Sequence, residues 1–350
     1  MRTALIAAVM LGSCAVMVGG WGAGEPGEPA PAPRTVPAGV GGAEQPRARG
    51  EFAYWWHVTG KAAGQVRWPG GEYRSDVAVI YEHDGGLYPR VYQGKEENGG
   101  LPQRADLRAH LSELERDIQR DIPDPNFSGW AVLDYESWDP VWELTKKEYR
   151  ERSVALVKRS DPRWSDADAE RLAKANYESG AKRFMLETIR KAKAVRPRAK
   201  WGYYALPWPT YERFEDRMKW LWEASDALYP CLYTDIPGLP PSDSAFPKGK
   251  RSLTAYVTDM RNRVELSRRL GGGKPVVAFL WVRYDHTGLF GGEFVNDGDL
   301  EAMLRVPRQA GADGAILWNQ AQSAQEAADL NGFVGERLLP MVKRVGERAR

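Results

Sequence analysis

The sequence contains few cysteines and few histidines, and it lacks a phosphate-binding glycine motif. Only Cys14 and Cys231 occur among its 350 residues, so a disulfide framework is excluded and packing must supply the stability. The four histidines never stand at metal-ligand spacing, which argues against a structural metal. No G-x-G-x-x-G follows an apolar run, and Pro275 stands where a phosphate loop needs Ser or Thr. We therefore expect no metal and no cofactor.

Charge of one sign is not in excess either. The sequence has 49 Lys and Arg against 47 Asp and Glu, a formal net charge of +2. A nucleic-acid-binding protein would carry a basic excess or a basic stripe, so nucleic acid is not an expected partner. Tryptophan, in contrast, is abundant, with 14 residues. Because its flat ring can pack against the C–H face of a sugar, this composition suggests a carbohydrate ligand.

The first 50 residues are expected to precede the folded domain. Residues 1–23 carry one positive charge, a short apolar core and then small residues, which is the layout of an export signal. The run LGSC resembles a bacterial lipobox, in which Cys14 would be lipidated and would anchor the protein to a membrane; simple cleavage before Gly24 is the alternative. Residues 24–50 are rich in Pro, Gly and Ala and predict a disordered linker. We expect an exported protein that is secreted, periplasmic or lipid-anchored at the bacterial envelope.

The remaining residues, 51–350, predict one α/β domain. Helix-like segments include 105–122, with a one-faced apolar stripe, and a long segment that a capping box at Ser165 and Asp168 opens. Strands that alternate with helices form a parallel sheet, and seven of them at this length predict a closed TIM-like barrel. The seven strand-like runs are almost continuously apolar, as strands covered on both faces are, and lie at 52–58, 76–82, 130–136, 201–205, 227–233, 276–282 and 314–319.

One of these runs ends in two acids, in the segment WAVLDYESWDPVW. Side chains alternate along a strand, so Asp134 and Glu136 point to the same side while Tyr135 faces the helices. Both acids lie at the carboxyl end of the strand, where barrel active sites are built. Two carboxyls this close disfavour double ionisation, so one pKa should rise and that group can act as a general acid. The alternative is a pair of exposed acids before a turn at Asp139 and Pro140.

The motif around these acids resembles the hyaluronidase family of glycoside hydrolases. LDYESWDPVW (133–142) matches the family signature of an aspartate, an aromatic, a glutamate and then W-x-P. The resemblance covers the chain from Phe52 to its C-terminus. Further motifs match in chain order, and they are YWWHVT (54–59), IYEHDGGLYPRV (80–91), NGGLPQRADLRAHL (98–111), YRERSVALVKRSDPRW (149–164), the stretch 181–207, ALYPCLY (227–233) and GADGAILW (311–318).

The resemblance implies a distorted barrel of about seven parallel strands and an endo-acting hydrolase. The implied reaction cuts the β-1,4 bond after N-acetylglucosamine in hyaluronan, or a similar bond in a chondroitin-like polysaccharide, with the substrate's own acetamido oxygen as the nucleophile. Glu136 is then the acid/base, and Asp134 holds and polarises the acetamido group. Substrate-binding positions are implied for Tyr204, Tyr233, Trp318, Asp285, Tyr135 and Trp138.

Some features depart from the animal members of this family. Their Asp-Cys-Tyr-Asn run is replaced by Trp208–Tyr211, which removes an acid and a disulfide cysteine, and the other disulfide cysteines are absent. We therefore interpret the chain as a bacterial member without the animal-type disulfides. Catalysis is expected to be retained because the acids Asp134 and Glu136 and the tyrosines Tyr204 and Tyr233 are all present. The alternatives are a glycan-binding barrel without hydrolytic activity and a hydrolase of chitin-like or cell-wall glycans.

Overall fold

A computed structural model describes residues 52–67, 76–234, 238–239, 251–285 and 291–347. The expected export signal, the linker and Cys14 lie outside these ranges, so the domain boundaries stay predictions. Within the ranges, no helix combines the length and the apolar composition needed to cross a membrane.

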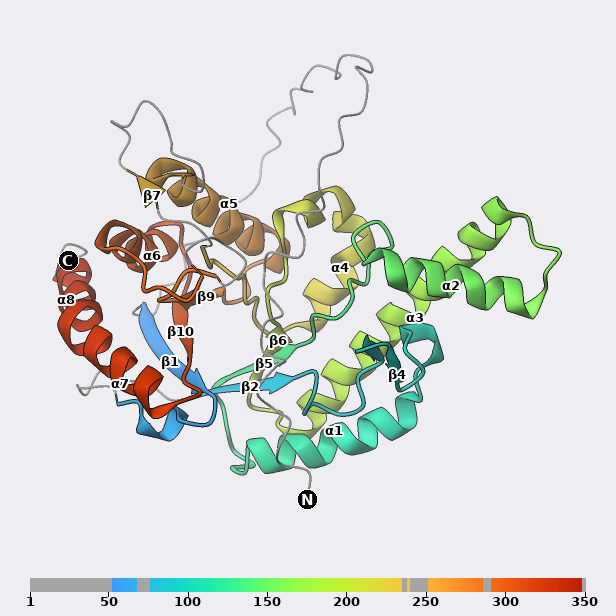
Figure 1. The fold of residues 1–350 in the computed structure, drawn as a ribbon, viewed down its shortest axis with the longest axis horizontal. Coiled ribbons are helices and arrows are strands. Elements are labelled where there is room, and N and C mark those ends of the chain that lie inside the picture. The colour runs from blue at the N-terminus through green and yellow to red at the C-terminus, as the bar shows by residue number, and fades with distance from the viewer. Residues whose placement is uncertain (1–51, 68–75, 235–237, 240–250, 286–290, 348–350) are drawn as a thin grey trace, which may run out of the picture.

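Two three-stranded parallel sheets form the centre of the molecule (Figure 1). One sheet has the order β2 (Val77–Tyr81), β5 (Trp130–Asp134), β6 (Lys200–Tyr203). The other has the order β1 (Ala53–Thr59), β10 (Gly314–Gln320), β9 (Val277–Trp281). All four pairings within these sheets are parallel. Six of the seven strand-like runs therefore form strands, and the parallel α/β arrangement is confirmed.

The seventh run, 227–233, lies between the two sheets without forming a regular strand. Isolated parallel bridges join Tyr229 to Tyr204 on one side and Cys231 to Phe279 on the other. Pro230 explains the irregularity because it has no N–H to donate to a ladder, although its carbonyl accepts a hydrogen bond from Phe279 (2.9 Å). Among the described strands no ladder joins β1 to β2, so the closed barrel stays a prediction.

Helices pack around the sheets, and the two whose starts the sequence predicts begin within two residues of those positions. The predicted helix at 105–122 is α1, and Ser165 caps the helix that follows it, since its side chain accepts a hydrogen bond from the Asp168 N–H (3.1 Å). The α-helices are α1 (Leu107–Asp121), α2 (Lys147–Ser160), α3 (Asp166–Val195), α4 (Glu215–Ala224), α5 (Leu253–Gly271), α6 (Asp297–Gln309), α7 (Ala324–Phe333) and α8 (Leu339–Glu347).

Shorter elements were not expected from the sequence. An antiparallel hairpin joins β3 (Arg90–Tyr92) to β4 (Lys95–Glu97), and β7 (Gly238–Leu239) pairs with β8 (Arg251–Ser252). A π-helical turn, Val334–Leu338, joins α7 to α8. Within the described residues, the 3-10 segments are Ala63–Gln65, Pro102–Arg104 and Pro209–Phe214.

Two apolar layers lie on opposite sides of β5. Ala131 and Leu133 belong to an outer cluster shared with the helices, together with Tyr135. Val132 belongs to an inner cluster made only of residues in or beside the strands, which are Trp55, Val132, Tyr204, Ala205, Ala227, Tyr229, Cys231, Val277, Phe279 and Ile316. The predicted orientation of Tyr135 toward the helices is therefore confirmed. The alternation along β5 carries Asp134 to the inner side.

Candidate active site

Asp134 and Glu136 meet at the carboxyl end of β5. The two carboxyls act on one another's pKa, and both residues are half-buried. Burial raises the pKa of Asp134 to about 7, and the nearby Glu82 carboxylate adds to this rise. Burial raises the pKa of Glu136 well above its usual value, followed by the charge of Asp134. The pair therefore holds a proton near neutral pH.

One oxygen of this pair lacks a partner. Asp134 Oδ1 is buried and accepts no hydrogen bond within the described part of the protein. An unsatisfied buried carboxylate oxygen costs about 1–3 kcal/mol or more, so such atoms are uncommon and concentrate at functional sites. The alternative interpretation, a pair of exposed acids at a strand end, does not describe this arrangement.

Three of the predicted substrate-binding residues form one aromatic wall on the inner side of the strands. The Tyr204 hydroxyl lies 3.4 Å from Cys231 Sγ, and its ring centroid lies 6.3 Å from that of Tyr233. Tyr233 in turn stacks on Trp318, with centroids 6.0 Å apart and planes inclined by 30°. The structure thus brings together side chains from three separate segments of the sequence, 29 and 85 residues apart along the chain.

The other three predicted residues are more enclosed. Asp285 is 3% exposed, and its backbone N–H donates to the Thr234 carbonyl (2.8 Å). The Tyr135 hydroxyl donates to the Gly85 carbonyl, and the Trp138 indole N–H donates to the Pro89 carbonyl (2.7 Å). Tyr135 and Trp138 line the edge of the cleft described below, but their polar atoms are bound to the main chain. Their contact with substrate stays a prediction.

Sequence reasoning missed Tyr81, which stands beside Asp134 in the register of β2 and β5. The Tyr81 hydroxyl accepts a hydrogen bond from the Trp318 indole N–H (2.9 Å) and lies 3.5 Å from His57 Nε2. Burial raises the pKa of Tyr81, followed by the charge of Asp134. Burial lowers the pKa of His57 to about 4, so this ring is neutral at physiological pH. The parallel register of two strand ends was the signal that could have found Tyr81.

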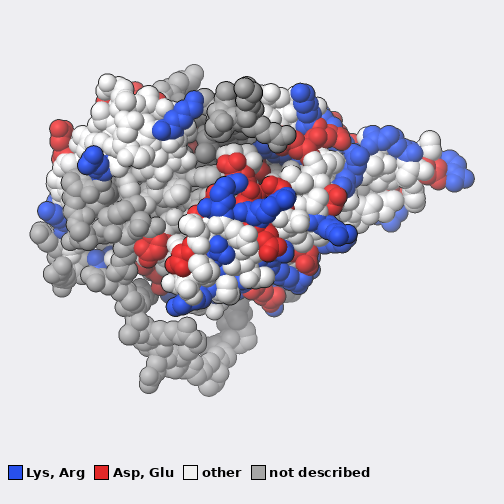
Figure 2. All heavy atoms as spheres, turned by 90° about the horizontal axis from the view of Figure 1, so that it is seen from below, with Lys and Arg blue, Asp and Glu red and all other residues white. Residues whose placement is uncertain are grey.

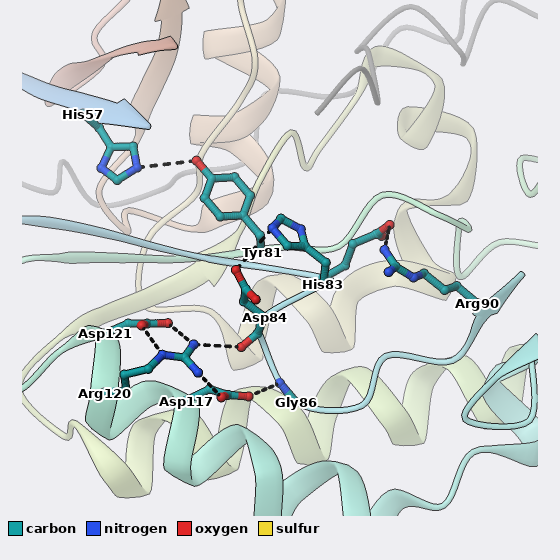
Figure 3. A network of polar contacts seen from close by, with 10 residues as sticks. His57, Tyr81, His83, Asp84, Gly86, Arg90, Asp117, Arg120 and Asp121 are labelled. Carbon is teal, nitrogen blue, oxygen red and sulfur yellow. Dashed lines mark hydrogen bonds and ion pairs between the residues drawn. The ribbon is translucent and has the colours of Figure 1, made fainter. Parts of the chain in front are cut away.

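The segment between β2 and β3, residues 82–89 and called the ledge below, is hydrogen-bonded to the acid motif. Each residue from 135 to 138 makes a hydrogen bond to Glu82, Gly85 or Pro89. Figure 3 shows how α1 holds this ledge, since Asp117 accepts a hydrogen bond from the Gly86 N–H (2.9 Å) and pairs with Arg120 (2.6 Å). The position of the acid motif therefore depends on a segment about 50 residues earlier in the chain.

A cleft of about 350 Å³ opens beside the pair. No group of three or more His, Cys, Asp or Glu side chains suited to a metal occurs in the described ranges. The cleft is lined by Glu136, Tyr204 and Trp208. Its other lining residues include Tyr88, Asp139, Glu143, Lys146, Lys147, Arg150, Met185 and Tyr211.

Trp208 and Tyr211, from the run that replaces the family's Asp-Cys-Tyr-Asn, contribute aromatic side chains to the lining of this cleft. The Arg263 guanidinium lies 4.4 Å from the ring centroid of Trp208. Tyr211 is fully buried and its hydroxyl donates to Asp139, whose pKa burial raises to about 7. Asp139 also accepts from the Val141 N–H (2.7 Å). Asp139 is thus a buried residue of the cleft lining and does not belong to an exposed turn.

Lys146 and Arg150 form a basic end to the cleft. Neither side chain makes an ion pair or hydrogen bond with another residue in the part of the chain that the structure describes. Some other basic side chains are paired, as when Arg217 binds Glu143 (2.8 Å). Figure 2 shows acidic and basic side chains intermixed over one face of the molecule. Lys146 and Arg150 therefore leave positive charge in the lining of this cleft.

Comparison with known proteins shows the family of this chain. Residues 69–350 match the model of the hyaluronidase family. The chain belongs to this family of glycosidases. The hyaluronidase-family resemblance of the motifs is thereby confirmed. A solved structure of bee venom hyaluronidase in complex with a hyaluronic acid tetramer has a similar α/β fold, with a TM-score of 0.71 and 27% identity, and the match covers 85% of this chain and 100% of that one.

Two curated relatives show the extent of the match. The chain is 31% identical over 290 residues to the chondroitin hydrolase of Caenorhabditis elegans and 32% identical over 311 residues to hyaluronidase-1 of Bos taurus. These matches cover 76% and 81% of this hyaluronidase-family chain. They cover 61% and 66% of the relatives, so the chain spans less than two thirds of their length.

Proposed function

We propose that this protein is an endo-acting glycoside hydrolase of hyaluronan-like glycosaminoglycans. It cleaves β-1,4 N-acetylhexosaminide bonds with retention of configuration, and the substrate's acetamido group is the nucleophile. The observation that carries the proposal is the pair of interacting carboxyls of Asp134 and Glu136, both with raised pKa values, of which Glu136 lines a cleft of about 350 Å³. A single protonated carboxyl suffices because the second catalytic group comes from the substrate.

Glu136 is the acid and then the base in this scheme. Its raised pKa keeps the carboxyl protonated, so that it can protonate the leaving glycosidic oxygen. The acetamido oxygen attacks the anomeric carbon, which forms a cyclic oxazolinium-like intermediate and releases the leaving sugar. Glu136, now ionised, takes a proton from the water that opens this intermediate. The sugar leaves with its original anomeric configuration and the acid is restored.

Asp134 and the aromatic wall support the acetamido group. Asp134 stays ionised while Glu136 holds the proton, and this anion accepts the acetamido N–H and offsets the positive charge that develops there. Tyr233, between Tyr204 and Trp318, is assigned a hydrogen bond to the same group. The aromatic faces supply apolar contact to the sugar rings, and Asp285, Tyr135 and Trp138 shape the surroundings.

The basic end of the cleft favours a polyanionic substrate over a chitin-like one. Lys146 and Arg150 carry charges that no acid in the described ranges neutralises, and a uronate carboxylate offers the matching charge. Two similar proteins point to polymers of this class, one named a chondroitin hydrolase and one solved with a hyaluronic acid tetramer. We therefore assign hyaluronan-like or chondroitin-like polysaccharide as the partner.

We also propose the finer features of the fold and location. The two sheets and the 227–233 segment would form one distorted seven-stranded barrel, because that segment already bridges them. Export of a bacterial protein, with or without lipidation of Cys14, is the proposed route to an extracellular polymer.

The proposal is tested by incubating the protein with hyaluronan, chondroitin and chitin oligomers and identifying the sugar at each new reducing end. N-acetylglucosamine from hyaluronan is the expected product, and Glu136→Gln is expected to lower kcat by about 100- to 10,000-fold with an unchanged circular dichroism spectrum. Polymer binding without new reducing ends would favour a glycan-binding protein. Cleavage of chitin oligomers alone would favour the chitin-like alternative, and an active Glu136→Gln variant would refute the mechanism.

A further inference from the structure

Glu82 follows β2 directly, and its carboxylate is bound to the segment that carries the acid. Glu82 Oε2 accepts hydrogen bonds from the backbone N–H groups of Glu136 (3.0 Å) and Ser137 (2.9 Å). Glu82 Oε1 accepts a third hydrogen bond from the Ser137 hydroxyl (2.6 Å). These donors lie where the chain leaves β5 and has no strand partner. One carboxylate therefore satisfies three donors at the turn that sets the direction of the Glu136 side chain.

Arg90 holds Glu82 from the opposite side. Its Nη1 lies 2.9 Å from Glu82 Oε1, and its Nε lies 2.6 Å from Glu97 Oε2. The Arg90 side chain is 8% exposed and that of Glu82 is 19% exposed, whereas Glu97 is 46% exposed. Figure 3 shows Arg90 reaching from the start of β3 back toward the end of β2. A guanidinium bound on two sides fixes the carboxylate more firmly than an exposed ion pair does.

The charge of Glu82 also acts on the acid pair. Burial is the largest cause of the raised pKa of both Asp134 and Glu136, and the negative charge of Glu82 contributes in the same direction to each. His83, the next residue, acts on Asp134 in the opposite sense. Arg90 is the cation that faces Glu82. Burial and the Glu82 charge both raise the pKa of the tyrosines around it, so these are uncharged at neutral pH, and they are Tyr88, Tyr135 and Tyr149.

We propose that Glu82 is a positioning residue for the acid, because it fixes the main chain of Glu136 and Ser137 so that the Glu136 carboxyl faces both the cleft and Asp134. This inference rests on the proposed function of Glu136. A displacement of a catalytic group by about 1 Å can cost about 100-fold in rate, so three hydrogen bonds that prevent such a displacement affect the rate. Glu82 itself touches no reacting atom in this scheme.

The test compares Glu82→Gln with Glu97→Gln. Both variants remove one negative partner of Arg90, but only the first disturbs the bonds to Glu136 and Ser137. Glu82→Gln is expected to lower kcat by about 10- to 100-fold with KM within about twofold. It should also move the alkaline limb of the kcat/KM profile to lower pH, because a charge that raises the pKa of Glu136 is gone. Glu97→Gln should leave kcat, KM and this limb within about twofold of the wild type.

A second measurement does not depend on turnover. Carbon-13 carboxyl NMR titration should give a lower pKa for Glu136 in Glu82→Gln than in the wild type, and equal values would overturn the inference. The same holds if kcat and the alkaline limb of Glu82→Gln equal those of Glu97→Gln. If Glu82→Gln does not fold, Arg90→Gln, which releases Glu82 from behind, should lower kcat with KM unchanged, and full activity would overturn the inference. Absence of turnover in the wild type would count against the proposed function alone.

Discussion

The carboxyls of Asp134 and Glu136 lie two residues apart at the same strand end and act on one another's pKa. The charge of Asp134 is, after burial, the largest cause of the raised pKa of Glu136. The two groups therefore titrate as a unit, and the behaviour of one reports on the other.

Replacing Asp134 should change the pH dependence of catalysis. Asp134→Asn removes a negative charge that raises the pKa of Glu136, so the acid loses its proton at lower pH. The alkaline limb of kcat/KM is expected to move to lower pH, with a lower kcat at every pH. An unchanged limb, measured with hyaluronan between pH 3 and 9, would contradict the link between these carboxyls. Should turnover be too slow, carbon-13 titration of Glu136 gives the same answer.

Removing the basic end of the cleft should weaken the binding of charged polymer alone. Lys146→Gln and Arg150→Gln are each expected to raise KM for hyaluronan by about two- to fivefold at low salt, and less at high salt, because exposed charge pairs are screened. Lys219→Gln is the matched control, since Lys219 is exposed, pairs with Glu223 at 3.8 Å and lies outside the cleft lining. An equal rise in KM for an uncharged chitin oligomer would show that charge recognition is not the cause.

His110 should make the folded state sensitive to acid. It is fully buried beside Thr188 (2.9 Å), and burial lowers its pKa to about 4. The unfolded chain binds a proton near pH 6.5 but the folded one does not, so stability is complete above pH 6.5 and falls as pH drops toward 4. The loss reaches about 3 kcal/mol. The free energy of unfolding in urea should fall less steeply with decreasing pH for His110→Gln than for the wild type. Parallel curves would contradict the prediction.

Two helical glycines should respond in opposite ways to alanine. A Cβ at Gly180 in α3 would lie 2.5 Å from Gln103 Cα, whereas one at Gly332 in α7 would meet no atom within 4 Å. Gly180→Ala is expected to destabilise by about 1–3 kcal/mol through overpacking. Gly332→Ala should stabilise by about 0.5–1 kcal/mol because alanine loses less backbone entropy. Thermal unfolding of the two variants measures both, and a stable Gly180→Ala would show that the helix can move.

Local patterns predicted the strands and the acid pair because they depend on neighbouring residues alone. Apolar runs identify strands covered on both faces, and the two-residue alternation places Asp134 and Glu136 together whatever the rest of the chain does. The apolar composition of the run at 227–233 predicts a strand, but Pro230 has no N–H to donate. That run therefore forms isolated bridges instead of a strand.

The remaining parts of the site depend on contacts between distant residues. Glu82 binds Glu136 across 54 positions, and Tyr81 meets Trp318 across 237. No period or motif in the sequence encodes such pairs, since they exist only after the strands have taken their register. Lys146 and Arg150 were missed for a related reason. In the sequence they resemble any basic helix start, and only the structure shows that acids elsewhere leave them unpaired.

The two layers around β5 limit how this stretch can change in length. Ala131, Val132 and Leu133 have no exposed surface and face the outer and inner clusters in turn. Deleting one of them would keep the apolar content but exchange the two sides, so that the carboxyls would turn toward the helices and Tyr135 toward the substrate. Natural variants should therefore carry insertions or deletions of an even number of residues here, or none at all, because only these keep both carboxyls on the substrate side.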